Sequence, residues 1–120
     1  MIIILPILFI ITLLYIFPII RVCEDSMLPT YHDGDILISF RLPIFFKKFF
    51  IKTGRVYIIK PPLYYENQRL NIKRLTKIKN KNMYFFEGDN KIVSYDSRSY
   101  GYLPKRKIFL LVLFKLKKGK

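Results

Sequence analysis

The apolar residues of this chain form one long run at the start and alternate with polar residues afterwards. Residues 2–20 (IIILPILFIITLLYIFPII) contain no charged side chain. As a helix with a rise of 1.5 Å per residue, they would extend about 30 Å, the hydrocarbon thickness of a bilayer. We therefore expect residues 1–21 to form a single transmembrane anchor. A cleaved signal peptide is the alternative, but no basic region precedes the run and no small-x-small site follows it.

The remaining residues, 22–120, have the pattern of one small β domain. Segments of strand length are either apolar or alternate with period two, and they lie at 35–41, 55–60, 71–79, 83–86 and 105–114. The polar turn at 80–82 joins two of these segments as a hairpin. Residues 88–104 are rich in turn formers, so we expect an ordered loop there.

Residues 42–52 (LPIFFKKFFIK) have a different pattern. A helical wheel separates rings from lysines, with Phe45, Phe46, Phe49 and Phe50 on one side and Lys47, Lys48 and Lys52 on the other. Such a turn is typical of a membrane interface, where rings enter the acyl boundary and lysines reach the headgroups. A hairpin whose rings pack inward is an equally good interpretation of the sequence.

The charge is strongly unbalanced, with a formal net charge of +14. This balance is typical of proteins that bind nucleic acid or an anionic membrane surface. Seven of the eight acidic residues nevertheless lie in two short stretches, 24–35 and 87–96, which indicates carboxylates placed for local geometry. The positive-inside rule would place the domain in the cytoplasm, but whole domains translocate largely regardless of charge. Charge therefore leaves the orientation open.

The candidate chemistry centres on Ser26, which lies between acidic residues and a Met-x-Pro-Thr turn. A serine hydroxyl needs a neighbouring base to become a good nucleophile. His32 is the only histidine, and we expect it to be an exposed turn residue. Lysine can serve as the base when burial lowers its pKa from about 10.4 by up to 3–5 units. Lys73, in the acid-poor strand 71–79, is the best candidate, although a solvated strand lysine is the alternative.

Metal and disulfide chemistry have little support in the sequence. The acidic residues carry no ligand spacing, so we expect no metal site and no cofactor. The single cysteine, Cys23, excludes an intrachain disulfide.

The chain resembles the type I signal peptidases of the Ser/Lys class over nearly its whole length. The similarity rests on an N-terminal anchor followed by Ser26-Met27-x-Pro29-Thr30, then Gly34-Asp35-Ile36, Gly54-Arg55-Val56, Lys73-Arg74 and Gly88-Asp89-Asn90-x-x-x-Ser94-x-Asp96-Ser97-Arg98-x-x-Gly101. The first and last motifs are highly specific at these spacings.

This resemblance implies a small antiparallel, barrel-like β-sheet as the catalytic domain, residues 22–120, behind one transmembrane helix. It implies that Ser26 is the nucleophile and Lys73 the general base of a membrane serine endopeptidase that removes leader peptides after small residues. We accordingly expect a single-pass protein of the cell membrane, with its domain on the extracytoplasmic face. Its partners would be precursor proteins and the lipid bilayer, not nucleic acid, and it would act as a monomer.

The resemblance also implies residues that support the lysine. Ser94 would hold the Lys73 amine by a hydrogen bond. Asp96 would pair with Arg98 and also with Arg74, which would stiffen the loop behind the lysine. A neutral partner at the amine is physically sensible, because a carboxylate in contact would favour the protonated form.

The substrate pocket is expected to be a shallow apolar groove beside the nucleophile. Its predicted lining is Met27, Leu28, Ile36, Leu37 and Ile38. An extended leader would add a strand along this edge, so that main-chain groups set its register.

Two features depart from the common family pattern. Glu24 occupies the position, two before the serine, where many bacterial members carry serine or glycine. We expect its carboxylate to point to solvent and the backbone N–H of Ser26 to bind the oxyanion. The stretch from Lys73 to Gly88 is a single hairpin without an inserted domain, as in compact members. The substrate could then be one dedicated precursor, for example a nickel superoxide dismutase precursor.

Other functions remain as alternatives. A self-cleaving Ser/Lys peptidase of the SOS-repressor type shares a similar Ser-Met…Gly-Asp opening, but residues 2–20 and the Asp-Ser-Arg loop argue against it. A non-enzymatic basic protein that binds membranes or nucleic acid would fit the charge and the aromatic residues. The apolar run and the clustered acids disfavour it.

Overall fold

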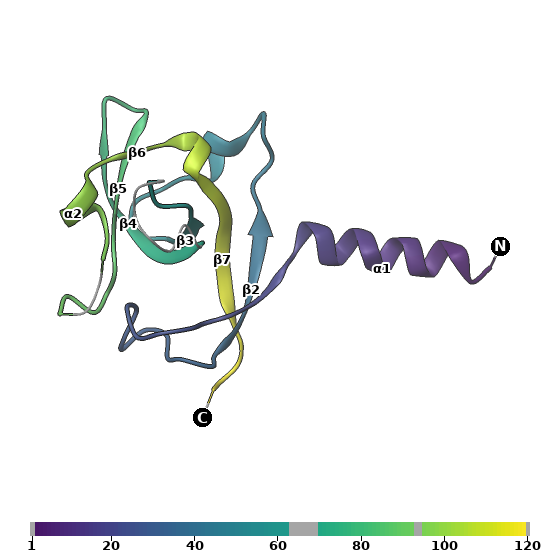
Figure 1. Cartoon of the computed structure of the whole chain (residues 1–120). Coiled ribbons are helices and arrows are strands. Elements are labelled where there is room, and N and C mark those ends of the chain that lie inside the picture. The colour runs from purple at the N-terminus through teal and green to yellow at the C-terminus, as the bar shows by residue number, and fades with distance from the viewer. Residues whose placement is uncertain (1, 63–69, 93–94, 120) are drawn as a thin grey trace.

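The fold is one curled antiparallel sheet from which an apolar helix projects (Figure 1). The computed structural model describes residues 2–62, 70–92 and 95–119. In chain order the elements are α1 (Ile4–Ile16), β1 (Ile19–Arg21), β2 (Ile36–Arg41), the 3-10 turn η1 (Lys47–Phe50), β3 (Val56–Ile59), β4 (Asn71–Lys79), β5 (Met83–Glu87), α2 (Ser97–Tyr100), β6 (Leu103–Pro104), the 3-10 turn η2 (Lys105–Lys107) and β7 (Ile108–Lys117).

The seven strands are ordered β1-β2-β7-β3-β4-β5-β6, and every neighbouring pair is antiparallel. Register shifts interrupt the β2–β7, β3–β7 and β4–β5 ladders. Such irregularities increase the local twist and bend of a sheet, and the sheet curls into a half-barrel (Figure 1). The prediction of a mainly β, antiparallel, barrel-like domain is therefore confirmed.

Period-two patterning located most strands correctly. The predicted strands at 35–41, 55–60, 71–79 and 83–86 correspond to β2, β3, β4 and β5. The last strand begins at Ile108 instead of Lys105, because residues 105–107 form η2. The loop expected at 88–104 contains the short helix α2 and the two-residue strand β6.

The core has two parts, one on each face of the central strand β3. All four β3 residues are buried, and they alternate between the two clusters. Tyr57 and Ile59 belong to the first cluster, and Val56 and Ile58 to the second. The second cluster also contains Met27, which anchors the segment that carries Ser26 onto the sheet.

Helix α1 is shorter than the predicted anchor. It ends at Ile16 after 13 residues, which span about 20 Å at the usual rise. The residue before a proline avoids helical backbone, and Phe17, before Pro18, has φ −120° and ψ 74°. Residues Ile19–Arg21 then pair with β2 instead of continuing the helix. Among the described residues, none of the helices has both the length and the apolar character needed to cross a membrane.

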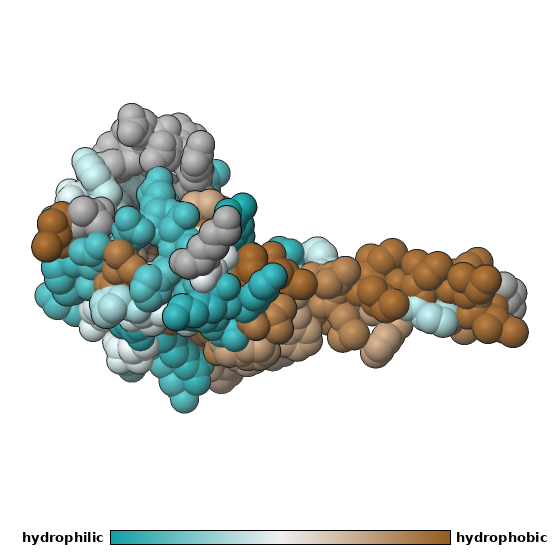
Figure 2. All heavy atoms as spheres, turned by 90° about the horizontal axis from the view of Figure 1, so that it is seen from below, coloured by the Kyte–Doolittle hydropathy of each residue, from teal (hydrophilic) through white to brown (hydrophobic). Residues whose placement is uncertain are grey.

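The surface of α1 is apolar and uncovered. None of its residues is buried, and Figure 2 shows an almost continuous hydrophobic surface on the projecting segment beside a largely hydrophilic domain. Its last turn is attached to β2. Arg41 donates from Nε to the Tyr15 carbonyl at 2.8 Å, and its guanidinium lies 4.3 Å from the centre of the Tyr15 ring.

The phenylalanine-rich segment 42–52 presents most of its rings outward. Phe45, Phe46 and Phe49 are exposed, whereas Phe50 packs against the first core cluster. The hairpin with inward-packed rings is thus contradicted for three of the four phenylalanines. A single 3-10 turn, η1, gives too little regular structure to turn all four rings to one side.

Candidate functional site

Ser26 lies in the loop between β1 and β2. Two backbone hydrogen bonds close this loop at its base: Val22 N–H donates to the Asp35 carbonyl at 2.9 Å, and Gly34 N–H donates to the Val22 carbonyl at 2.8 Å. Met27 is fully buried beneath the loop. The loop therefore presents the half-buried Ser26 from a fixed base.

Lys73 lies on β4 and is only 4% exposed. Burial disfavours an ammonium ion and lowers the pKa of Lys73. The negative charges of Asp96 and Glu24 oppose this effect, while the positive charge of Arg98 adds to it. The result is a pKa below the ordinary lysine value, so Lys73 is not the solvated strand lysine that the sequence left as an alternative.

Ser26 and Lys73 lie on the wall of one cavity of about 330 Å³. One side of this cavity is formed by residues 20–24 and the opposite side by residues 70–73, and Ile58 and Leu110 complete the lining. The curled sheet brings these two segments together although they are about fifty positions apart in sequence.

Both sides of the cavity carry strand edges for which residues 2–62, 70–92 and 95–119 supply no second strand partner. Within the described part of the chain, β1 pairs only with β2. Residues 71–73 of β4 pair with β3, and the pairing of β4 with β5 begins at Arg74. An extended peptide in the cavity would therefore meet a free strand edge on each side.

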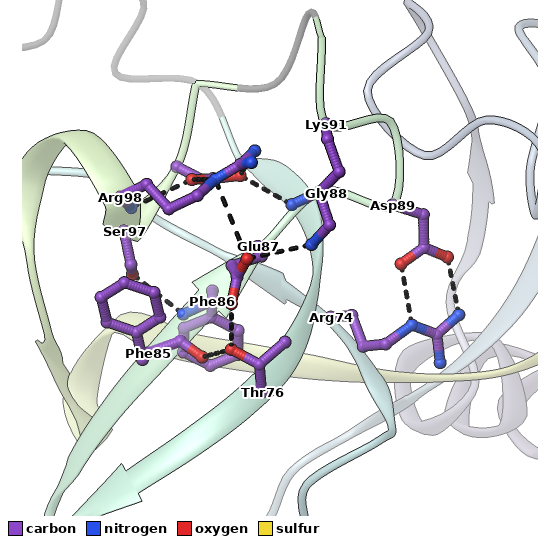
Figure 3. Close-up of polar contacts among 11 residues, drawn as sticks. Arg74, Thr76, Phe85, Phe86, Glu87, Gly88, Asp89, Lys91, Ser97 and Arg98 are labelled. Carbon is purple, nitrogen blue, oxygen red and sulfur yellow. Dashed lines mark hydrogen bonds and ion pairs between the residues drawn. The ribbon is translucent and has the colours of Figure 1, made fainter.

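A set of hydrogen bonds ties the Ser26 loop to the segment after β5. Asn90 donates from its backbone N–H to the Ser26 carbonyl at 2.9 Å and from Nδ2 to the Asp25 carbonyl at 3.0 Å. The Thr30 hydroxyl donates to Asp89. Asp89 in turn accepts from Arg74 Nε at 2.9 Å and from Arg74 Nη2 at 2.8 Å (Figure 3). Since Arg74 follows Lys73, these contacts fix the Ser26 loop relative to β4.

Asp96 organises a second set of contacts beside this one. It is fully buried and accepts from Gly88 N–H at 2.8 Å, from Arg98 Nε at 2.9 Å and from Arg98 Nη2 at 2.8 Å (Figure 3). It also caps α2 by accepting from the Arg98 N–H at 3.0 Å. The carboxylate holds the pKa of Arg98 above its usual value.

The expected partners of Asp96 are thus only partly correct. Asp96 pairs with Arg98, but Arg74 pairs with Asp89. Arg74 faces Glu87 in the β4–β5 ladder, and Asp89 lies two positions further along the chain, where a diagonal cross-strand neighbour is within reach of a long side chain. Ser94, the expected partner of the Lys73 amine, lies outside the described residues.

The residues predicted to line the substrate pocket do not line the cavity beside Ser26. Met27 and Leu37 are fully buried in the second core cluster, and Leu28, Ile36 and Ile38 do not line the cavity beside Ser26 either. The apolar lining is instead Ile20, Val22, Ile58, Leu70, Ile72 and Leu110. These residues come from four separate segments, and only the alternation of Ile72 with Lys73 along a strand hinted at any of them.

His32 lies where the sequence suggested, whereas the direction of the Glu24 carboxylate stays a prediction. Glu24 is exposed on the cavity wall with φ 80°, and its N–H donates to Asp33 Oδ1 at 2.8 Å. Its carboxylate nevertheless acts on Lys73, because its charge raises the pKa of the lysine. His32 is an exposed turn residue. The role of the Ser26 N–H as oxyanion donor stays a prediction.

Residues 2–62, 70–92 and 95–119 contain no group of three or more histidine, cysteine, aspartate or glutamate side chains arranged to hold a metal ion. The arrangement instead provides a hydroxyl and a buried amine of low pKa on one cavity, which is suited to nucleophilic chemistry. No protein-family model and no curated protein matches the chain.

Proposed function

We propose that this protein is a membrane-anchored serine endopeptidase that removes leader peptides from precursor proteins. The observation that carries the proposal is that Ser26 and the buried Lys73 line the same cavity. In this proposal Ser26 is the nucleophile and Lys73 the general base. No cofactor takes part.

The chemistry follows from the protonation state of Lys73. A neutral Lys73 amine accepts the proton of the Ser26 hydroxyl as the oxygen attacks the scissile carbonyl carbon, giving a tetrahedral oxyanion. The ammonium then gives this proton to the leaving amine as the C–N bond breaks. A water molecule, deprotonated by the same amine, cleaves the resulting acyl ester and regenerates Ser26. A positioned base of this kind contributes about 10²–10⁴-fold in rate.

The surroundings of the lysine support this role. Asp96, fully buried, is engaged by Arg98 and by the Gly88 N–H, so much of its charge is compensated beside the amine. Compensation matters because a free carboxylate would stabilise the ammonium and raise the pKa of Lys73. In the proposed site Ser94 donates or accepts the hydrogen bond that aims the amine, as the resemblance to signal peptidases implies.

The cavity supports an extended substrate with small side chains. Free strand edges on both sides offer backbone hydrogen bonds, as in other cases of strand addition to a sheet. The cavity has a volume of about 330 Å³, and half of its lining residues are aliphatic. We infer that a leader peptide binds between β1 and β4 with alanine-sized residues directed into this lining.

The bilayer is the proposed partner of α1. Its thirteen residues are uncharged and none is buried, and a mainly apolar surface of this extent without a covering partner marks a membrane or protein contact. We propose that α1 attaches a monomeric protein to the cell membrane, with the domain on the extracytoplasmic face.

A dedicated maturation peptidase is a narrower version of the same function. The observation that favours it is the short connection between β4 and β5, which leaves only residues 80–82 between the two strands. No inserted domain extends the substrate surface there. Cleavage of one precursor but not of a panel of secretory leaders would support this version.

The test is cleavage of a membrane-anchored precursor with an Ala-x-Ala site by detergent-solubilised protein. We expect Ser26→Ala and Lys73→Ala each to lower the cleavage rate by at least about 10²-fold. Ser99→Ala and Lys77→Ala are matched controls, because both side chains are exposed, and their rates should stay within twofold of wild type. Undiminished cleavage by the Lys73→Ala variant would remove the proposed mechanism.

A further inference from the structure

A second apolar surface lies on the segment between β2 and β3. We call residues 43–50 the aromatic loop. Its side chains Ile44, Phe45, Phe46 and Phe49 are 81%, 90%, 58% and 68% exposed, respectively. Single exposed apolar residues are ordinary on a protein surface, but a contiguous group of this kind marks an interaction site.

The aromatic loop is held at both ends. Leu42 and Ile51 are buried in the first core cluster. The buried Tyr57 hydroxyl donates to the Phe50 carbonyl at 2.7 Å and accepts from the Lys52 N–H at 2.8 Å. The exposed rings are therefore presented outward from a fixed base, and their exposure does not come from a detached segment.

The aromatic loop and α1 are attached to the same strand end. The Phe40 ring, on β2, lies 5.7 Å from the Phe17 ring after α1 and 5.1 Å from the Phe50 ring. In Figure 1 the loop continues from β2, the strand beside the domain end of α1. One row of three neighbouring, mutually tilted rings thus connects the end of the apolar helix to the base of the aromatic loop.

Among the described residues, the charged side chains of the aromatic loop and of the adjoining turn η2 are all positive. The lysines of the loop are Lys47 and Lys48, Lys52 follows, and Lys47 Nζ donates to the Lys105 carbonyl at 3.4 Å, which brings the basic turn η2 alongside. No aspartate or glutamate occurs in residues 36–65 or 97–120. Rings rimmed by cations alone suit a surface that is apolar inside and anionic outside, which describes a bilayer with anionic headgroups.

We propose that the aromatic loop is a second membrane contact, with its rings in the acyl boundary of an anionic bilayer and its lysines at lipid phosphates. The proposal rests on the membrane attachment proposed for α1, not on the peptidase chemistry. A second copy of this chain is a poorer occupant, since two loops rimmed only by lysines would repel each other. Two points of attachment would fix how the domain, and with it the cavity beside Ser26, is oriented at the bilayer.

The experiment uses fluorescence, because the chain contains no tryptophan. Phe45→Trp places a reporter in the aromatic loop. Ile92→Trp is the matched control, since Ile92 is 91% exposed on the segment between β5 and α2, which Figure 1 places on the side of the domain away from α1. The full chain is reconstituted into phosphatidylcholine–phosphatidylglycerol vesicles with and without brominated acyl chains. We expect brominated lipid to quench more than half of the emission of F45W and less than a fifth of that of I92W.

Two further arms test the charge and the alternative occupant. Replacing Lys47, Lys48 and Lys52 by glutamine in the F45W background should reduce the quenching at least twofold, as should pure phosphatidylcholine. Equal quenching of F45W and I92W would overturn the proposal. An F45W emission that brominated lipid does not quench, and that shifts with protein concentration in detergent, would also overturn it, because the loop would then contact a second copy of the chain. Repeating the measurement with Ser26→Ala separates the outcomes, because loss of peptidase activity leaves the expected quenching unchanged.

Discussion

Arg74 and Asp89 form a two-point ion pair that joins the strand of the proposed base to the loop of the proposed nucleophile. The two nitrogen–oxygen distances are 2.9 and 2.8 Å, and the same carboxylate accepts from the Thr30 hydroxyl. The pKa of Asp89 is held below its usual range, and the hydrogen bonds from Arg74 have the largest effect. The position of Ser26 relative to Lys73 thus depends on a contact between residues that take no part in the proposed chemistry.

Asp89→Asn should loosen this connection. Asparagine keeps the size but loses the charge, and it can accept only one of the two guanidinium hydrogen bonds, so we expect the variant to lose about 1–3 kcal/mol of unfolding free energy. We also expect a lower cleavage rate at an unchanged pH optimum. Chemical denaturation and a pH–rate profile measure the two effects. Lys91→Gln is the control, because the Lys91–Glu87 pair has a largely exposed lysine and should contribute little.

Glu24→Gln should make the peptidase active at lower pH. The negative charges of Asp96 and Glu24 raise the pKa of Lys73, whereas the positive charge of Arg98 lowers it. Removing the charge of Glu24 lowers the pKa of the lysine further, so the neutral amine forms at lower pH and the acid limb of the rate profile should move to lower pH. Asp25→Asn, a change at the neighbouring exposed carboxylate, should leave the limb in place. An unmoved limb in the Glu24→Gln variant would contradict the proposed influence on Lys73.

Asp35 should make the fold sensitive to acid. Its carboxylate is fully buried and accepts from the His32 N–H at 2.8 Å, from the Gly119 N–H at 2.7 Å and from Lys115 Nζ at 3.1 Å. These contacts lower the pKa of Asp35 to about 2, and the two backbone hydrogen bonds have the largest effect.

The direction of the pH effect follows from this shift. The pKa of Asp35 is lower in the folded state than in the unfolded state. The resulting stabilisation of the fold is therefore fully present above the ordinary aspartate pKa of about 4. It is lost as the pH falls from about 4 towards 2. Thermal unfolding midpoints recorded across this range should therefore fall more steeply for wild type than for Asp35→Asn. Parallel curves would show that other carboxylates dominate.

Tyr57→Phe tests how firmly the aromatic loop is held. The phenol ring is buried in the first core cluster, and its hydroxyl makes two hydrogen bonds to the loop backbone. Loss of the hydroxyl leaves the Phe50 carbonyl and the Lys52 N–H without this partner, so we expect a loss of about 1–3 kcal/mol in unfolding free energy. Tyr102→Phe is the comparison, since its ring is only half-buried. Equal stability of the two variants would mean that water replaces the lost bonds at the loop base.

Local patterning explains why much of the fold was predictable. A strand that buries one face must alternate, and the alternation in residues 71–79 located β4 and placed Lys73 within it. The pairing of Asp96 with Arg98 was implied by the resemblance to signal peptidases, and it needs only a short turn because the two residues are two positions apart.

The features that were not predicted depend on distant residues. The sequence showed an uncharged run over residues 2–20, but the pairing of β1 with β2 ends the helix at Ile16. Arg74 pairs with Asp89 because of the register between β4 and β5, and this register cannot be deduced from the spacing of charges along the sequence.

What the sequence determined by itself is which residues are candidates for the proposed chemistry and where most strands lie, since both depend on residue type and on spacing along the chain. The tertiary structure decided what surrounds those residues. The curl of the sheet brings β1 and β4 to the same cavity. The burial of Lys73, the lining of the cavity and the exposure of the phenylalanines all depend on this arrangement. Burial is a property of contacts between distant segments, and the pKa of an amine responds to that burial.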